Sequence, residues 1–193
     1  RRTHAATDES RTKSRLMVAV KSARSREERA APLAREYLYS FVMQAWQSVD
    51  PAPFKDNWHI GCMCEYLEAV ADSEIPKLVI NVPPGHQKSL TVSVFWPVWT
   101  WIRRPQKRFM ATAYRGDLAL RDPQKSRDLI RSPWFRRHFG SSFPLAGDQD
   151  TKTRYPTKQG GCRFPTCGTG INGSGGQLVT VEHPTNAHNT STH

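Results

Sequence analysis

A long apolar run and a dense set of cysteines are both missing from this sequence, and each absence excludes a class of protein. No stretch of about eighteen or more apolar residues occurs, and the first 31 residues lack the apolar segment of a secretory signal. We therefore expect a protein that is neither membrane-spanning nor secreted. The cysteines are spaced CxC and CxxxxC, which fits neither a compact zinc site nor a disulfide framework and favours packed, reduced thiols. They are Cys62, Cys64, Cys162 and Cys167.

Acidic residues are scarce relative to basic ones. The 193 residues include 28 Lys and Arg against 17 Asp and Glu, which gives a formal charge of +11. Such an excess attracts polyanions at long range and makes nucleic acid the leading class of partner. Residues 1–31 are rich in Arg, Lys, Ser and Thr, and we predict that they form a flexible basic arm ahead of a single folded domain.

Apolar periodicity predicts alternating helices and strands from residue 32 onward. Helices are expected over residues 32–48, 60–70 and 89–102, and two more are expected to begin at Asp122-Pro123 and Ser132-Pro133. Strands are expected over residues 77–82, 108–113, 153–155, 162–164 and 178–181. This alternation favours an α/β sheet with helices on its faces.

The segment NVPPGHQKSL, residues 81–90, is close to a phosphate-binding loop but lacks its glycines. When Lys88 and Ser89 are aligned with the pattern GxxxxGK[ST], the glycine positions hold Val82 and Gln87. Gly85 is left to let the backbone approach an anion. A strand, a tight turn and a helix in this order aim backbone N–H groups at a phosphate, with Lys88 on the β- and γ-phosphates and Ser89 on Mg²⁺. The alternative is a proline-rich turn that caps a helix and binds no ligand.

A strand that ends in an acid follows about ninety residues downstream. In the segment LVTVEH, Glu182 occupies the place of a carboxylate that holds Mg²⁺. His183 stands where a second carboxylate would orient the attacking water. A neutral imidazole can accept a proton but adds no negative charge. The alternative for residues 178–182 is a core strand that ends in a solvated acid.

Several segments occur in an order that resembles the ATPase half of the large terminase subunit of tailed bacteriophages. The resemblance spans about residues 36–187. It rests on WHIGCMCEYLEAV, INVPPGHQKSLTVSVFWPVW, ATAYRGDLALRD, RDLIRSPWFRRHFG, DQDTKTRYPTKQGGCRF and the glycine-rich turn that leads to VTVEHP. The resemblance implies a P-loop NTPase-like sheet with flanking helices over residues 32–187, incomplete on its C-terminal side, and a disordered tail over residues 188–193.

The same resemblance implies a motor in the cytoplasm of a bacterial host. Such a motor uses ATP and Mg²⁺ to move double-stranded DNA into a procapsid, as a homo-oligomeric ring that works with a portal protein and a small terminase subunit. Carried over by position, Lys88 and Ser89 are the phosphate and magnesium residues, Glu182 is the Walker B acid and Trp58 lies near the adenine. The alternative for Trp58, favoured on the residue alone, is a buried aromatic that anchors the helix over residues 60–70. Arg121, like Arg115, is a candidate for a cation supplied to a neighbouring subunit. The nucleotide-binding set is Trp58, Pro84, Gly85, His86, Gln87, Lys88 and Ser89, and the catalytic set is Glu182, His183 and Arg121.

Two departures from that family leave other interpretations open. The family has Asp-Asp or Asp-Glu before proline where this chain has Glu182-His183-Pro184, and its members continue into a coupling motif and a nuclease domain. A truncated, non-catalytic prophage remnant that binds nucleotide or DNA without turnover is therefore the second hypothesis. A basic DNA-binding protein with no nucleotide site is the third.

Overall fold

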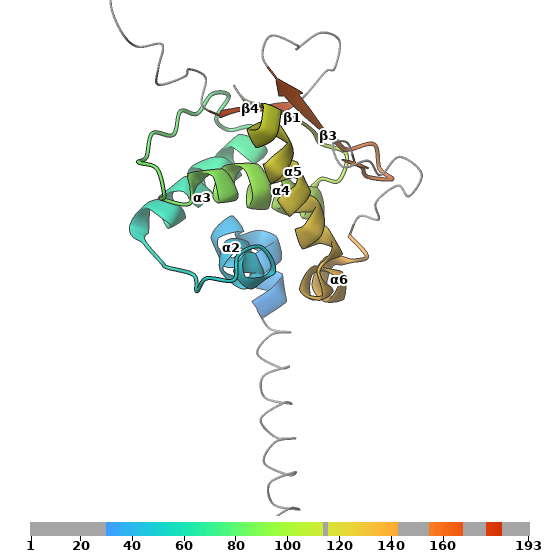
Figure 1. The fold of residues 1–193 in the computed structure, drawn as a ribbon. Helices are drawn as coiled ribbons and strands as arrows, with labels where there is room; N and C mark the ends of the chain where they lie inside the picture. Colours follow the sequence, from blue (N-terminus) through green and yellow to red (C-terminus); the bar gives the residue numbers. More distant parts are fainter. Residues whose placement is uncertain (1–29, 114–115, 143–154, 168–176, 183–193) are drawn as a thin grey trace, which may run out of the picture.

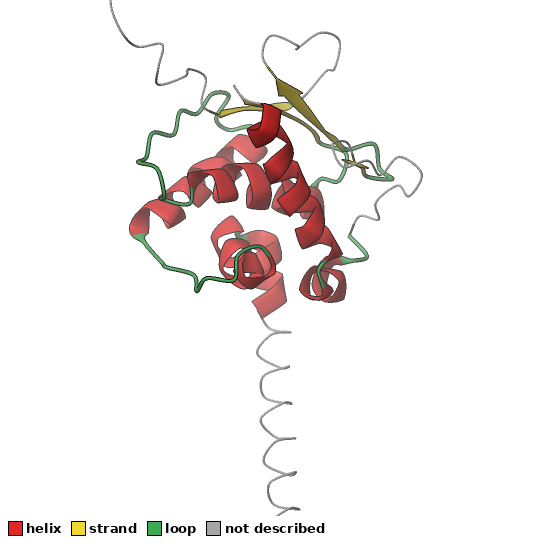
Figure 2. Ribbon diagram, viewed as in Figure 1, coloured by secondary structure: helices red, strands yellow, loops and turns green. Residues whose placement is uncertain are grey.

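A computed structural model describes residues 30–113, 116–142, 155–167 and 177–182 (Figure 1). Most of the expected basic arm, the whole expected tail and the glycine-rich turn at 168–176 lie outside these residues. Within the described part of the chain, no helix is both long enough and apolar enough to cross a membrane. The described residues form a small sheet and a set of helices that cover it, as the α/β prediction requires (Figure 2).

The sheet contains four described strands in the order β2-β3-β1-β4. These are β1 (Arg108–Ala113), β2 (Tyr155–Pro156), β3 (Cys162–Cys167) and β4 (Leu178–Glu182). Strand β1 is central and pairs in parallel with β3 and β4, whereas β2 pairs with β3 in the antiparallel sense. The register sets Phe109 opposite Leu178 and Ala113 opposite Glu182, so the carboxyl ends of β1 and β4 coincide. In the view of Figure 1, helices α3, α4 and α5 lie on one side of this sheet.

Two amphipathic segments at the N-terminal side form helices close to the predicted bounds. Residues 30–36 are helical, the helix is interrupted at Tyr37, and α2 (Leu38–Ala45) continues into a short 3-10 turn, η1 (Trp46–Ser48). Helix α3 (Trp58–Ala71) follows. The backbone N–H of Leu38 donates to Glu68 Oε1 at 2.6 Å. A side chain of α3 therefore satisfies a donor at the start of α2, where the N–H groups have no partner within the helix.

Glu68 supplies a stability prediction because its carboxyl group is partly buried. Burial, as the largest cause, raises the pKa of Glu68 above its ordinary value of 4.5, although the Leu38 hydrogen bond opposes the shift. The folded state then binds the proton more tightly than the unfolded state, so this group's contribution to the free energy of unfolding falls as pH rises above 4.5.

We expect Glu68→Gln to keep the acceptor for Leu38 and to remove this pH dependence. The variant should match the wild type near pH 4 and be the more stable protein near pH 7, in urea denaturation at both values. Glu65→Gln, on the exposed side of the same helix, should leave most of this pH dependence in place, because the Glu65 charge is the smallest of the causes that raise the pKa of Glu68. A variant less stable than wild type at pH 7 would contradict the argument.

The predicted helix over residues 89–102 forms, with an irregularity that has a specific cause. Lys88 and Ser89 begin the helix, η2 (Leu90–Phe95) is a π-turn, and α4 (Trp96–Arg103) continues it. Pro97 has no N–H, so it cannot donate to the carbonyl of Ser93 four residues earlier. The preceding backbone relaxes into i to i−5 bonding, in which Trp96 N–H donates to Thr91 O.

A buried arginine from the sheet donates a hydrogen bond to the carbonyl of Ser93, which receives none from Pro97. Arg163 of β3 is 1% exposed, and its Nη1 donates both to Ser93 O and to Ser126 Oγ, the latter at 2.9 Å. Ser126 of α5 (Gly116–Arg131) lies with its Oγ 3.3 Å from Ser93 O. The side chain of Arg163 thereby links three elements: β3, the π-turn and α5.

Replacing Arg163 with methionine should destabilise the fold by about 1–3 kcal/mol, because a buried carbonyl group loses a donor. The loss should be smaller by about 1 kcal/mol in a Pro97→Ala background, where the restored N–H can bond to Ser93 O. Urea unfolding of the four proteins in this double-mutant cycle measures the difference. An equal loss of unfolding free energy in both backgrounds would show that Arg163 does not stabilise the fold through the carbonyl of Ser93.

Two expectations from the sequence are wrong. Residues 77–82, all of them described, form no strand, and Val79 is 91% exposed rather than buried. Leu78, Ile80 and Val82 are half-buried, so the segment has one apolar face but no strand beside it to pair with. Helix α5 begins at Gly116 instead of Asp122, with Pro123 inside it, because its packing against η2, β1 and β3 outweighs the local start signal. The start predicted at Ser132-Pro133 is confirmed: α6 (Pro133–Phe139) has Ser132 as its cap, accepting from Phe135 N–H.

Candidate nucleotide-binding loop

The turn that joins residues 77–82 to the helix has two residues in left-handed conformation. Gly85 has φ 84° and Gln87 has φ 61°, and the helix begins at the next residue, Lys88. A Cβ added at Gly85 would meet nothing within 4 Å, so the glycine is needed for its backbone angle and not for space. Gln87 occupies the position at which the phosphate-loop pattern has its second glycine. The backbone conformation typical of glycine is therefore present although the glycine is not.

Imidazole groups hold this turn in place. The ring of His86 folds back so that Nδ1–H donates to Pro83 O at 3.2 Å and to Pro84 O at 3.1 Å. From α3, Nε2–H of His59 donates to the carbonyl of His86 at 3.3 Å. These contacts turn carbonyl groups of the loop toward imidazole donors. The side-chain amide of Gln87 adds a weak tie to Lys55 O at 3.4 Å.

The left-handed angle at Gln87 carries strain that glycine would relieve. We expect Gln87→Gly to stabilise the folded protein by about 0.5–1 kcal/mol, since the αL cost for a non-glycine residue exceeds the added chain entropy and the loss of a weak side-chain bond. Gly85→Ala should destabilise it by about 1 kcal/mol for the same reason in reverse. Thermal unfolding of both variants measures the pair. Destabilisation by Gln87→Gly would indicate that the Gln87 side chain is what holds the turn.

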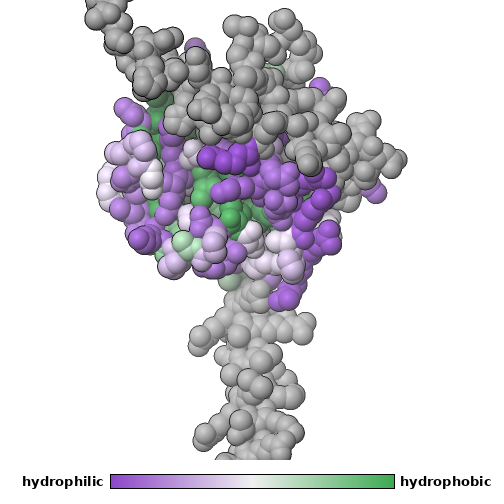
Figure 3. Space-filling model, viewed as in Figure 1, coloured by the Kyte–Doolittle hydropathy of each residue, from purple (hydrophilic) through white to green (hydrophobic). Residues whose placement is uncertain are grey.

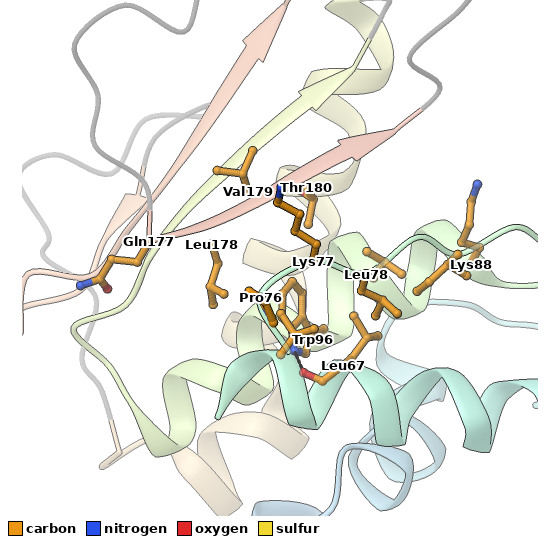
Figure 4. Close-up of a pocket in the computed structure, with 13 residues that line it drawn as sticks. Leu67, Pro76, Lys77, Leu78, Lys88, Trp96, Gln177, Leu178, Val179 and Thr180 are labelled. Atoms are coloured by element: carbon orange, nitrogen blue, oxygen red, sulfur yellow. Dashed lines mark hydrogen bonds between the residues drawn. The ribbon is translucent and has the colours of Figure 1, made fainter. Parts of the chain in front are cut away.

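A cavity of about 480 Å³ lies between this helix, α3, residues 76–80 and the outer edge of β4 (Figure 4). Lys88 and residues 177–180 line it together, so the helix that follows the loop faces the first half of β4. In Figure 4 the Lys88 amine points away from the other lining side chains. No carboxylate among the described side chains pairs with Lys88 within 4 Å. The rest of the lining is mainly apolar and includes Leu67, Leu78, Val92 and Trp96.

The structure brings together some of the predicted residues and separates others. Lys88 and Ser89 open the helix at the loop, and Glu182 ends β4 at the carboxyl edge of the sheet, opposite Ala113. The Glu182 side chain, His183 and Arg115 lie outside what the structure describes. Arg121 is exposed on α5, where its Nε pairs with Asp122 Oδ1 at 2.9 Å, and it does not line the cavity.

Trp58 lies on the surface next to the loop. The sequence allowed either a base-stacking role or a buried anchor for α3, and the anchor interpretation is wrong because Trp58 is 81% exposed. It neighbours His59, whose ring lies 5.4 Å from that of His86. Lys77, which lines the cavity, was not singled out from the sequence, and neither was the contact of His59 with the loop. The contact joins His59 to His86, which is 27 residues further along the chain, and no local sequence pattern indicates such a contact.

Comparisons with protein-family models, with curated proteins and with solved structures found no match to this chain. Function is therefore inferred from the geometry of the loop and from the ordered sequence motifs.

Proposed function

We propose that this chain is the P-loop ATPase part of a DNA-packaging motor of the large-terminase type, which uses ATP hydrolysis to move double-stranded viral DNA into a procapsid. The observation that carries this proposal is the pair of left-handed residues, Gly85 and Gln87, immediately before a helix that begins with Lys88-Ser89. Backbone in this arrangement turns N–H groups and a helix N-terminus toward an anion.

The chemistry of the loop residues suits a magnesium-bound nucleoside triphosphate. Residues 84–89 would surround the phosphates, the Lys88 ammonium would offset their charge, and the exposed face of Trp58 would be available to the base. Ser89 and Glu182 would hold Mg²⁺. The metal, when bound, would neutralise charge that develops on the phosphoryl group. Hydrolysis further needs a group that orients water, and His183 is the residue at that position.

The charge of the chain supports a nucleic-acid partner. The exposed side chains of Arg131, Arg136 and Arg137 follow one another along α5 and α6, and the whole chain carries +11. The purple band over the right side of Figure 3 lies where these helices stand in Figure 1. On this proposal the chain acts on double-stranded DNA in the bacterial cytoplasm, as part of a ring with portal and small terminase subunits. Arg121, exposed on α5, would be the cation offered to a neighbouring copy.

A second candidate function follows from a single residue. His183 replaces the carboxylate that the family has before proline, so the chain would bind nucleotide or DNA as a prophage remnant without turnover. Both candidates predict nucleotide binding, and they differ only in hydrolysis.

Titration calorimetry of MgATP into the full chain tests the shared part of the proposal. We expect MgATP to bind at one site with micromolar affinity, which is a binding free energy of about −8 kcal/mol. MgCl₂ alone should give no heat. Hydrolysis should then be followed by phosphate release with double-stranded DNA present, because an isolated motor subunit can be nearly idle. DNA binding without any ATP binding would leave the third interpretation, a basic DNA-binding protein, and overturn the motor.

A further inference from the structure

A second hollow, with a volume of about 270 Å³, lies on the surface between α3 and residues 78–82. Its lining is mostly aromatic and aliphatic, and three of its side chains are strongly exposed: Trp58 at 81%, Tyr66 at 51% and Val79 at 91%. Figure 3 shows hydrophobic side chains reaching the surface at the upper left, where residues 77–82 lie in Figure 1. Large exposed apolar side chains gathered around a hollow mark a place where another segment binds.

The helix side of this hollow carries more carboxylates than cations. Residues 56–76 contain five Asp and Glu and no Lys or Arg, of which Asp72 pairs with Arg103 and Arg104, and Lys77 follows directly after the range. Glu65 follows Trp58 by seven residues, which puts it on the same stripe of α3, and it is exposed. Glu74, also exposed, follows the end of that helix. An occupant of this surface should therefore have a short apolar centre and basic residues on both sides.

One segment of this chain has that composition. Residues 13–24, KSRLMVAVKSAR, hold five consecutive apolar residues between Lys13 and Arg15 on one side and Lys21 and Arg24 on the other. They lie outside the described residues. We propose that residues 13–24 dock on the hollow of their own chain, with the run 16–20 against Trp58, Tyr66 and Val79 and the flanking cations toward the acids of α3. The proposal does not depend on nucleotide binding, although the docked run and a bound base would compete for the exposed face of Trp58.

The length of chain between the two segments permits this contact. Leu38 lies close to the hollow, because its backbone N–H donates to Glu68, two residues from Tyr66. Residue 30 precedes Leu38 by eight residues, which at the rise of a helix is about 12 Å. The nine residues between Val20 and residue 30 can span up to about 30 Å. The arm can therefore reach the hollow without a second copy. Docked there, it would lie beside the segment that leads into the candidate nucleotide-binding loop.

Cys62 is a reporter for this docking because it lines the hollow and is partly exposed. Cys64 is buried, and burial raises its pKa to about 12, while Cys162 is also buried, so both should react slowly with maleimide. With Cys167→Ser in every protein and no nucleotide present, we expect Leu16→Asp with Val18→Asp to raise the labelling rate of Cys62 about fivefold or more. The charge-matched control, Thr3→Asp with Ala5→Asp, should leave the rate unchanged. Equal rates in all three proteins would overturn the proposal.

A cross-linking experiment on the full chain identifies the occupant. In the same Cys167→Ser background, Val18→Cys should form a disulfide with Cys62 within one chain under mild oxidation, and Ala5→Cys should not. Peptide mapping locates the bond, and gel mobility shows whether it lies within one chain or between two. Equal yields from both positions, or a disulfide only between chains, would overturn docking on the same chain. Thermal unfolding of each variant confirms that the folded domain is intact.

Discussion

Lys88→Ala is expected to weaken MgATP binding by about a hundredfold or more while DNA binding survives. If the turn at Gly85 and Gln87 surrounds the phosphates, the Lys88 ammonium is the cation closest to their charge in the described part of the site. Losing a charge-assisted contact of this kind to a phosphate costs about 3 kcal/mol, which corresponds to the stated factor. Titration calorimetry of the full-length variant measures it.

Lys77→Ala is the matched control for this experiment. Lys77 lines the same 480 Å³ cavity and carries the same charge, but it precedes the turn by several residues. Its removal should change MgATP affinity by less than about threefold, as screened charge alone would. DNA affinity in both variants should fall with salt with nearly the slope of the wild type, because each loses one charge out of many. Equal ATP affinity in wild type and Lys88→Ala would rule out a phosphate-binding loop here.

The backbone of the candidate loop shows what residue identity alone could not indicate. The sequence pattern counts Gln87 as a missing glycine, which weakens the motif. The structure shows φ 61° at that residue, held by a helix on one side and a turn fixed by His86 on the other. A left-handed angle costs a non-glycine residue only about 1 kcal/mol, and favourable contacts of the neighbouring residues can outweigh that cost. The place of Gln87 in the loop follows from its spacing to Lys88, whereas its left-handed backbone angle is not predictable from a glutamine.

Contacts between distant segments explain most of the remaining differences. An irregular helix around Pro97 follows from the sequence alone, because proline has no N–H. The donation from Arg163 to Ser93 O does not, because it joins residues seventy positions apart. Residues 77–82 have the short apolar run between prolines that is typical of a buried strand. A strand also needs a neighbour at hydrogen-bonding distance, and a cavity separates this segment from β4. Periodicity identified β1, β3 and β4 correctly because each of them pairs with a described neighbour.

Replacing His183 with glutamate is expected to raise DNA-stimulated ATP hydrolysis by about a hundredfold, the size of a general-base contribution. Glu182 ends β4 at the carboxyl edge of the sheet, and on the proposed function His183, the next residue along the chain, would orient the attacking water. A carboxylate there accepts a proton and adds negative charge that helps to hold Mg²⁺, which neutral imidazole does not. Phosphate release at saturating MgATP measures the rate.

The control for this substitution is His188→Glu, the same chemical change five residues downstream. It alters net charge equally, so it should leave hydrolysis at the wild-type level if position 183 acts through the site. MgATP affinity should be similar in all three proteins, since Lys88 and the turn are untouched. If His183→Glu binds MgATP with wild-type affinity and hydrolysis stays at background, the chain binds nucleotide without turnover, and the prophage-remnant function replaces the motor. If both variants rise equally, the gain comes from charge alone and Glu182-His183 is not the water-orienting pair.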